Sequence, residues 1–445
     1  MSGMMIAQLL VLLTAIAIGA RAGGVGMGLW GGVGMAVLVF GFRAAPGAIP
    51  GEVLLIILTV IMAASAMEAA GGIDYLVKIA AGIIRKSPKH VTIIAPLVAY
   101  VFTFLAGTGH IFYPLLPVIY EVAMKGRVRP ERPIAVATIA SQQAITASPV
   151  SAATAAMIAL LGAKGIGLAQ ILLICIPSTL LGVIVAALVQ NHIGVELEND
   201  PEYQRRLASG EIAQAGTADV NPTEIAQLHP RAGLSAGMFL IGVLVVVCAG
   251  LFPVLRSVAA EDGKAITVSM PMTIAIVMLM LAALMCLFAG ASAAAIVKTK
   301  TCQAGITAVI GILGLAWLGD TFFDDNATAI NTALKTWVEH YPAMFAIGLF
   351  LLSMLLFSQA ATAQTLMPLG LTLGIAPAAL AGMFPAVNGY FFIPTYGTLI
   401  AAVNFDRSGT TRIGKYVLNH SFMLPGLIST TVAVGTGLVI AKVFF

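Results

Sequence analysis

Polar side chains that can hold an anion gather in one apolar stretch, ASQQAITASPVSAAT, from Ala140 to Thr154. Pro149 interrupts the helix that the surrounding apolar residues would otherwise form. A broken helix exposes backbone N–H groups at a partly positive N-terminus, and both features suit a carboxylate. Within a bilayer such a break is tolerated only where protein or water satisfies the backbone. We interpret the stretch as an anion-binding segment; the alternative is a proline kink whose hydroxyls bond the preceding turn.

A second break of the same kind occurs in VNGYFFIPTYGTLIAA, where Pro394 lies 245 positions after Pro149. The segment GTGHIFYPLLP at 107–117 has a counterpart in SQAATAQTLMP at 358–368, and the apolar runs that end in GGID and LGD form a third pair. Three landmarks therefore recur in the same order at nearly constant spacing. Such recurring discontinuous segments indicate an internal repeat whose halves share one substrate site.

The candidate substrate-binding residues come from these segments, because a dicarboxylate needs two anion pockets about one short carbon chain apart. The candidates are Gly107, Thr108, Gly109, His110, Gln142, Gln143, Thr146, Ser148, Pro149, Ser151, Ser358, Gln359, Thr362, Asn388, Pro394, Thr395 and Thr398. The glycines permit close backbone approach. His110 is expected either to pair with substrate or carry a proton as an imidazolium, or to be a neutral histidine bonded to a helix carbonyl.

Acidic residues offer a second kind of candidate. Asp74 and Asp320 end apolar runs at repeat-related positions, and intramembrane acids are functional candidates by default. An aspartate at such a junction is also a common cap for the helix that follows, and we favour that interpretation. Asp406, in the polar turn FDRSGTTRIGK, is expected to pair with Arg407 or Arg412 and to anchor the turn rather than bind substrate.

The composition defines the elements that must position these residues. Of 445 residues, 59% are hydrophobic and 9% are charged, whereas soluble proteins carry about 25% charged residues. The chain is therefore an all-α polytopic membrane protein, with about 10 to 14 transmembrane or re-entrant helices for a ~30 Å core. A polar linker at 191–232, expected to be cytoplasmic, separates an N-terminal membrane repeat, 1–190, from a C-terminal one, 233–445. If the repeats have inverted topology, all the basic loops lie on the cytoplasmic side and both termini lie outside.

Several classes of function are not favoured. Cys175, Cys248, Cys286 and Cys302 are scattered without CxxC spacing, so neither a disulfide nor a metal site is expected. There is no HExxH and no pair of deep catalytic aspartates, which disfavours an intramembrane enzyme. We predict no cofactor and no nucleic-acid partner. GARAGGVGMGLWGGVG lacks the βαβ context of a dinucleotide site and indicates small-residue helix packing. A channel is a further alternative, but two oppositely placed breaks suit alternating access better than a continuous pore.

Longer motifs resemble one family. These are GTGHIFYPLLPVIYEVA, RPERPIAVATIASQQAITASPVSAA, IPSTLLG, AWLGD, SQAATAQTLMP and FDRSGTTRIGKYVLNHSFMLPG. In order and spacing, from residue 6 to about residue 442, they resemble the anaerobic C4-dicarboxylate uptake carriers, the Dcu family in its A/B branch. The match is weakest in the linker at 193–232.

The resemblance implies a bacterial inner-membrane secondary carrier for fumarate, malate, aspartate and succinate. Carriers of this family typically exchange external fumarate for internal succinate during anaerobic respiration. The wider superfamily implies inverted repeats with hairpins and allows a homodimer. A proton- or sodium-coupled dicarboxylate symporter is the alternative within the same class.

Overall fold

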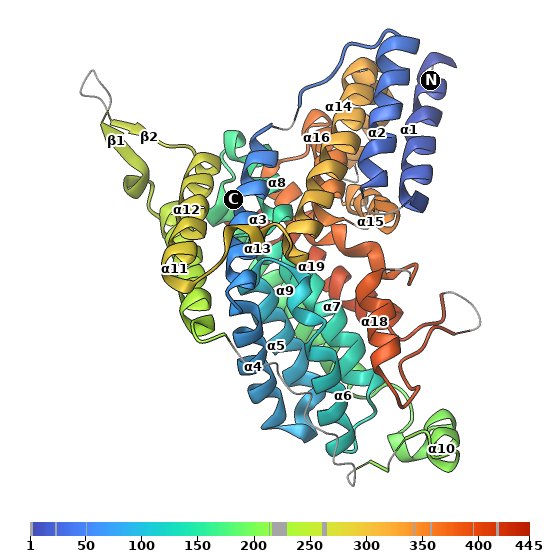
Figure 1. Cartoon of the computed structure of the whole chain (residues 1–445). Helices are drawn as coiled ribbons and strands as arrows, with labels where there is room; N and C mark the ends of the chain where they lie inside the picture. Colours follow the sequence, from blue (N-terminus) through green and yellow to red (C-terminus); the bar gives the residue numbers. More distant parts are fainter. Residues whose placement is uncertain are drawn as a thin grey trace.

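The protein is described from a computed structural model of the whole chain. The described residues are 3–22, 25–49, 51–212, 214–215, 229–259, 265–340, 343–356, 358–394, 396–414 and 418–445. Helices make up most of this part of the chain, which confirms the all-α prediction (Figure 1). The described residues also contain a short antiparallel hairpin, β1 (Ser257–Ala259) with β2 (Ala265–Thr267), which was not predicted from the sequence.

The N-terminal half contains nine α-helices in its described part. They are α1 (Gly3–Ala22), α2 (Gly26–Ala36) with the π-helical turn η1 (Val37–Gly41), α3 (Gly51–Ala69), α4 (Gly72–Arg85), η2 (Pro88–His90), α5 (Val91–Ala106), η3 (Gly109–Phe112), α6 (Leu115–Lys125), α7 (Glu131–Ala147), α8 (Ala152–Leu161), η4 (Gly162–Lys164) and α9 (Leu168–Gln190).

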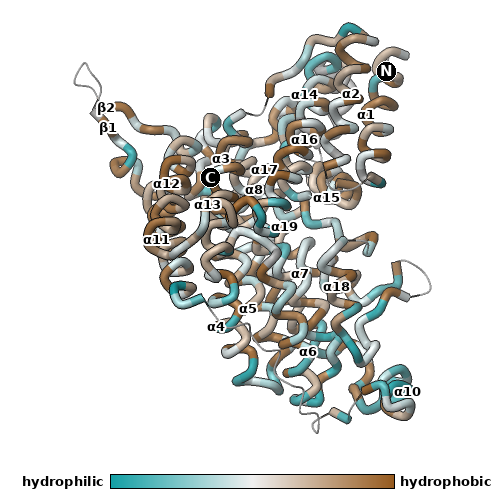
Figure 2. The backbone as a smooth tube through the Cα atoms, viewed as in Figure 1, coloured by the Kyte–Doolittle hydropathy of each residue, from teal (hydrophilic) through white to brown (hydrophobic). Residues whose placement is uncertain are grey.

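The linker and the C-terminal half follow. Their elements are η5 (Leu197–Asn199), α10 (Pro201–Ala208), α11 (Ala232–Leu251), η6 (Pro253–Arg256), α12 (Met270–Leu284) with the π-helical turn η7 (Met285–Ala289), α13 (Ala293–Ile296), α14 (Lys300–His340), α15 (Met344–Leu356), α16 (Gln359–Thr372), α17 (Pro377–Met383), η8 (Phe384–Phe391), α18 (Gly397–Phe405) and α19 (Met423–Phe444). Figure 2 shows hydrophobic residues over α11 and α12 and hydrophilic ones over α10.

Length and composition identify the membrane segments. Among the described residues, seven helical stretches are long and apolar enough to cross a membrane, or eight if α3 and α4, bent by 73°, form one span. Three shorter apolar helices bring the total into the predicted range. The 11 residues of α6 and the 14 of α16 extend only about 17 and 21 Å at 1.5 Å per residue. Each is therefore too short to cross a ~30 Å core alone.

Matching features recur in the two halves. The π-helical turns that end α2 and α12 begin at Val37 and Met285, 248 positions apart. The helix α2 packs against α14, and α12 packs against α3. The broken pair α7 and α8 also has a counterpart in η8 and α18. These recurrences favour the predicted repeat, and its inverted orientation stays a prediction.

The glycines of α2 allow an unusually close helix crossing. A Cβ added at Gly28 would lie 2.0 Å from the carbonyl oxygen of Ile310, and one at Gly31 would lie 2.5 Å from the carbonyl carbon of Gly314. Both contacts are with the backbone of α14, so any side chain would separate the helices. This confirms the interpretation of the glycine-rich stretch as small-residue packing.

Neither candidate acid is a helix cap, so that prediction was wrong. Asp320 lies inside α14, because the helix continues to His340 and no proline interrupts it. Its Oδ2 accepts a hydrogen bond from the backbone N–H of Ala48 at 2.8 Å and so holds the loop before α3. Asp74 lies in the first turn of α4, but the N-cap is Gly71, so its charge acts on the helix dipole.

Asp406 anchors its turn, as predicted, but through hydrogen bonds rather than an ion pair. Its buried carboxylate accepts from the N–H of Thr411 at 2.6 Å, the hydroxyl of Thr410 at 2.9 Å and both donors of Ser408. Within the described part of the chain no arginine pairs with it, so the expected pairing was wrong. Thr410 Oγ1 also accepts from the N–H of Glu131 at 3.1 Å, which docks the turn onto the start of α7.

Candidate functional site

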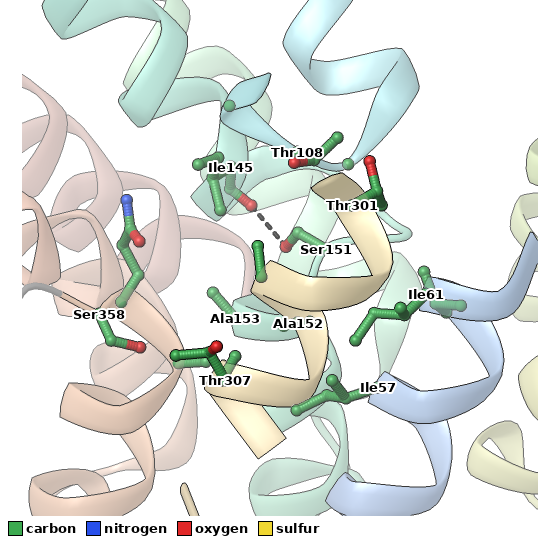
Figure 3. Close-up of a pocket in the computed structure, with 18 of the residues that line it drawn as sticks. Ile57, Ile61, Thr108, Ile145, Ser151, Ala152, Ala153, Thr301, Thr307 and Ser358 are labelled. Atoms are coloured by element: carbon green, nitrogen blue, oxygen red, sulfur yellow. Dashed lines mark hydrogen bonds between the residues drawn. The ribbon is translucent and has the colours of Figure 1, made fainter. Parts of the chain in front are cut away.

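A cavity of about 440 Å³ lies between the broken helices of the two halves and the α3–α14 pair (Figure 3). Eight of the predicted site residues line it. They are Gly107, Thr108, Gly109, Gln142, Ser151, Ser358, Gln359 and Thr398. The opposite wall is apolar or small, with Ile57 and Ile61 from α3 and Gly305 from α14.

The first break forms where the sequence predicts it. The helix α7 ends at Ala147, Ser148 is extended, and α8 begins after its N-cap Ser151. Ser151 Oγ accepts from the N–H of Thr154 at 3.1 Å and donates to the carbonyl of Ile145 at 2.6 Å (Figure 3). The new helix therefore starts at the cavity with its first turn directed into it.

Two further helices start at the same cavity. Ser358 is the N-cap of α16, and its Oγ accepts from the N–H of Ala361 at 3.2 Å. Thr398 lies in the first turn of α18, after the second break. Three helix N-termini, one from the first half and two from the second, thus line one space.

The described part of the cavity wall carries polar groups on one side but no charged side chain. None of the described residues that line the cavity is Asp, Glu, Lys or Arg. Two of its buried hydroxyls, those of Thr301 and Thr398, have no hydrogen-bond partner among the described residues. An anion here would be held by helix N-termini, amides and hydroxyls.

Other predicted residues do not line the cavity. Gln143, Thr146 and Asn388 are fully buried behind it, Ser148 turns its hydroxyl to the carbonyl of Phe104, and Thr362 back-bonds to the carbonyl of Ser358. Pro149 and Pro394 shape the breaks without lining the space. Thr395 and the side chain of His110 lie outside the described residues, so the structure does not address the His110 prediction.

The contribution of α14 was not predicted from the sequence. Thr301, Ala304, Gly305 and Ala308 line the cavity at the i, i+3, i+4 and i+7 positions of that helix. Thr307 also lines the cavity, and the small side chains of this stripe were the sequence signal that could have identified this helix face. Tyr113 and Tyr396 also line the space.

A polytopic helical fold with an uncharged cavity between broken helices, lined on one side by polar groups, is typical of a membrane transporter. The chain belongs to the anaerobic C4-dicarboxylate membrane transporter family, whose sequence profile matches residues 4–445. It is therefore a multi-pass transporter of the bacterial inner membrane and not an enzyme. The resemblance stated from the motifs is confirmed.

Individual relatives agree with this assignment. The chain is 42% identical to the C4-dicarboxylate transporter DcuA of Wolinella succinogenes, over 99% of this chain and all of that one. It is 37% identical to the anaerobic C4-dicarboxylate transporter DcuB of Escherichia coli O6:H1, over 98% of both chains. A crystal structure of the Alcanivorax borkumensis YdaH transporter shares the fold, with a TM-score of 0.58 at 15% identity over 99% of this chain and 98% of that one.

Proposed function

We propose that this protein carries C4-dicarboxylates, namely fumarate, malate, aspartate and succinate, and exchanges external fumarate, malate or aspartate for internal succinate by alternating access. The observation that supports it most is the meeting of helix N-termini from both halves at one cavity. Its relatives are named C4-dicarboxylate transporters. Two N-termini that face one space give a short dianion one pole for each carboxylate.

Each carboxylate is assigned to one helix N-terminus. One lies at the start of α8, beside Ser151 and Thr108, and the other at the start of α16, beside Ser358 and Gln359. Thr398 adds a hydroxyl from α18, and the apolar α3 wall contacts the carbon chain. A hydrogen bond to a charged group contributes about 1.5 to 3 kcal/mol, so a few such bonds replace a formal cation.

Exchange fits this wall better than cation-coupled symport. A symporter usually holds its cation with a buried acid beside unwound carbonyls. None of the described residues that line the cavity is acidic. A carrier that crosses loaded in both directions needs no separate ion, because a second dicarboxylate carries negative charge back across the membrane on the return step.

Liposomes containing the purified protein test the proposal. With succinate inside, labelled fumarate should enter faster than without it, and removal of sodium should leave this exchange largely intact. Strict sodium dependence without stimulation by internal succinate would instead establish a symporter. Absence of any dicarboxylate transport would refute the substrate class itself.

We also propose inverted repeats at 1–190 and 233–445 around the linker at 191–232, and a homodimer. In a background without the four native cysteines, Ser209→Cys should react only with a membrane-permeant maleimide in intact cells, and Val258→Cys with an impermeant one. The reverse pattern would overturn the topology.

Native mass measurement in detergent tests the homodimer. It should give twice the chain mass, and a single-chain mass would exclude the dimer.

A further inference from the structure

Four carboxamides form one hydrogen-bonded chain that runs from the cavity wall into the protein. Gln359 Nε2 donates to Gln142 Oε1 at 3.0 Å and to Asn388 Oδ1 at 3.3 Å. Asn388 Nδ2 donates to Gln143 Oε1 at 3.1 Å, and Gln143 Nε2 donates to Thr430 Oγ1 at 3.0 Å. All five side chains are buried. The chain joins α7, α16, η8 and α19, so both halves contribute to it.

A backbone carbonyl sets the direction of this chain. The two ends of a carboxamide have similar shapes, but one only donates and the other only accepts. Asn388 Nδ2 donates to the carbonyl oxygen of Pro385 at 3.1 Å, and a carbonyl oxygen can only accept. Asn388 must therefore present Oδ1 to Gln359. Gln359 must therefore donate from its NH2 group, and Gln142 must accept with its oxygen.

The last amide is consequently turned with its donor toward the cavity. Gln142 and Gly109 both line the cavity, and a Cβ added at Gly109 would lie 2.9 Å from Gln142 Nε2. No acceptor among the described residues bonds this NH2 group; the hydrogen bond that Gln142 makes through its side chain uses Oε1. Gln142 is buried as a whole, and a donor that lacks an acceptor among the described residues and borders a cavity suits an acceptor on a ligand.

We propose that Asn388 is a positioning residue that orients the Gln142 NH2 group toward the substrate, and that this orientation selects a carboxylate over a carboxamide at one end of the ligand. The inference rests on the proposed dicarboxylate site. A carboxylate presents two charged acceptor oxygens to Gln142 Nε2. A carboxamide has one NH2 group, which cannot accept from Nε2, and one uncharged oxygen, which accepts a weaker hydrogen bond. Asn388 acts through Gln359 and touches no substrate itself.

The test compares succinate with its monoamide, succinamate, as competitors of labelled fumarate exchange in liposomes. The measured quantity is the ratio of the two inhibition constants. In Asn388→Leu the anchor to Pro385 is lost and the amides of Gln359 and Gln142 can invert. Succinate should then bind about tenfold more weakly while succinamate changes little, so the ratio falls by about tenfold, equivalent to about 1.4 kcal/mol.

Two variants of neighbouring glutamines separate positioning from a structural role. Gln142→Met keeps the length of the side chain but removes the donor, so it should lower the ratio as Asn388→Leu does. Gln143→Met is the matched control: it is equally buried and in the same chain, but it lies on the far side of the Pro385 anchor, so the ratio should not move. Gln142→Met also keeps the test decisive should Asn388→Leu fail to fold.

The outcomes are distinguishable. If wild-type protein binds no dicarboxylate, the proposed function and this inference both fail. If it binds succinate and the ratio is unchanged in both Asn388→Leu and Gln142→Met, the inference alone fails. An equal fall of the ratio in Gln143→Met would show that any disturbance of the buried chain has the same effect, and would remove the positioning role.

Discussion

The two breaks that border the cavity use their hydroxyls differently. In the first break, between α7 and α8, the serines are committed to the main chain: Ser148 Oγ donates to the carbonyl of Phe104 and Ser151 Oγ donates to that of Ile145, each at 2.6 Å. In the second break, between η8 and α18, the hydroxyl of Thr398 is buried without a partner among the described residues.

This difference indicates which hydrogen-bond donors remain available to a ligand. A hydroxyl that already donates to a carbonyl holds the break in shape, and its loss leaves a buried acceptor unsatisfied. A buried hydroxyl without a protein partner has its donor left for substrate. The first break should therefore offer mainly the backbone N–H groups of α8, and the second break a side-chain donor as well. Substitutions at each break test this division.

The largest effect is expected at Gly107, which packs against the first break. Its φ of +69° belongs to the left-handed region, and an added Cβ would lie 2.8 Å from the carbonyl oxygen of Val150. Gly107→Ala should combine left-handed strain with steric overlap and destabilise the protein by about 3 kcal/mol or more. Size-exclusion profiles and fumarate uptake should both collapse.

Gly162→Ala is the control for that substitution. Gly162 ends α8 with helical dihedral angles, and nothing lies within 4 Å of its added Cβ. This variant should fold and transport as the wild type does. Normal transport by Gly107→Ala would show that the first break does not depend on the close approach to Val150.

The next largest effect is expected at Thr398, in the second break. Thr398→Val keeps the shape and removes the hydroxyl, so KM for dicarboxylates should rise about 10- to 150-fold, the equivalent of 1.5 to 3 kcal/mol for a bond to a charged group. Thermal stability should not fall, because the hydroxyl bonds no described residue. Thr411→Val removes another buried, unpartnered hydroxyl away from the cavity, and its KM should match the wild type. Equal KM values in the wild type, Thr398→Val and Thr411→Val would contradict the conclusion that the second break offers a side-chain donor to the substrate.

A smaller effect, on stability alone, is expected at Ser148. Phe104 lies in the last turn of α5, where carbonyls lack partners within the helix, so Ser148→Ala should leave its oxygen unsatisfied and cost about 1 to 3 kcal/mol. KM should stay constant because Ser148 does not line the cavity. Ser65→Ala, which removes an unpartnered buried hydroxyl, should not reduce the unfolding temperature. A raised KM with unchanged stability in Ser148→Ala would show that Ser148 contacts the substrate after all.

Local chemistry explains what the sequence could predict. Pro149 and the capping serine Ser151 define the first break by rules that act within a few residues, and the structure places the break there. The membrane class follows in the same way from composition, and the small-residue crossing of α2 follows from its glycines. These features depend little on how distant segments pack.

The rotation of each helix about its axis explains what the sequence could not predict. Gln142 and Gln143 are adjacent on α7, about 100° apart around the axis, and nearly every side chain of that helix is buried. No hydrophobic stripe marks which glutamine faces the cavity. Only packing against α16, η8 and α19 turns Gln142 to the cavity and Gln143 to Thr430. The same holds for Thr301 and Thr307, which reach the site from a helix more than 140 positions beyond the first break.

The smallest effect is expected at Thr362, one turn into α16. Its hydroxyl donates to the carbonyl of Ser358 at 2.8 Å, but that oxygen also accepts the backbone N–H of Thr362 at 3.0 Å. Thr362→Val therefore leaves no acceptor unsatisfied, in contrast to Ser148→Ala. Because Thr362 does not line the cavity, KM should stay within about twofold and stability within about 0.5 kcal/mol. The check is exchange kinetics and thermal unfolding beside Thr398→Val. A KM increase comparable to that variant's would mean that back-bonded hydroxyls also reach the substrate, and the division between the two breaks would no longer hold.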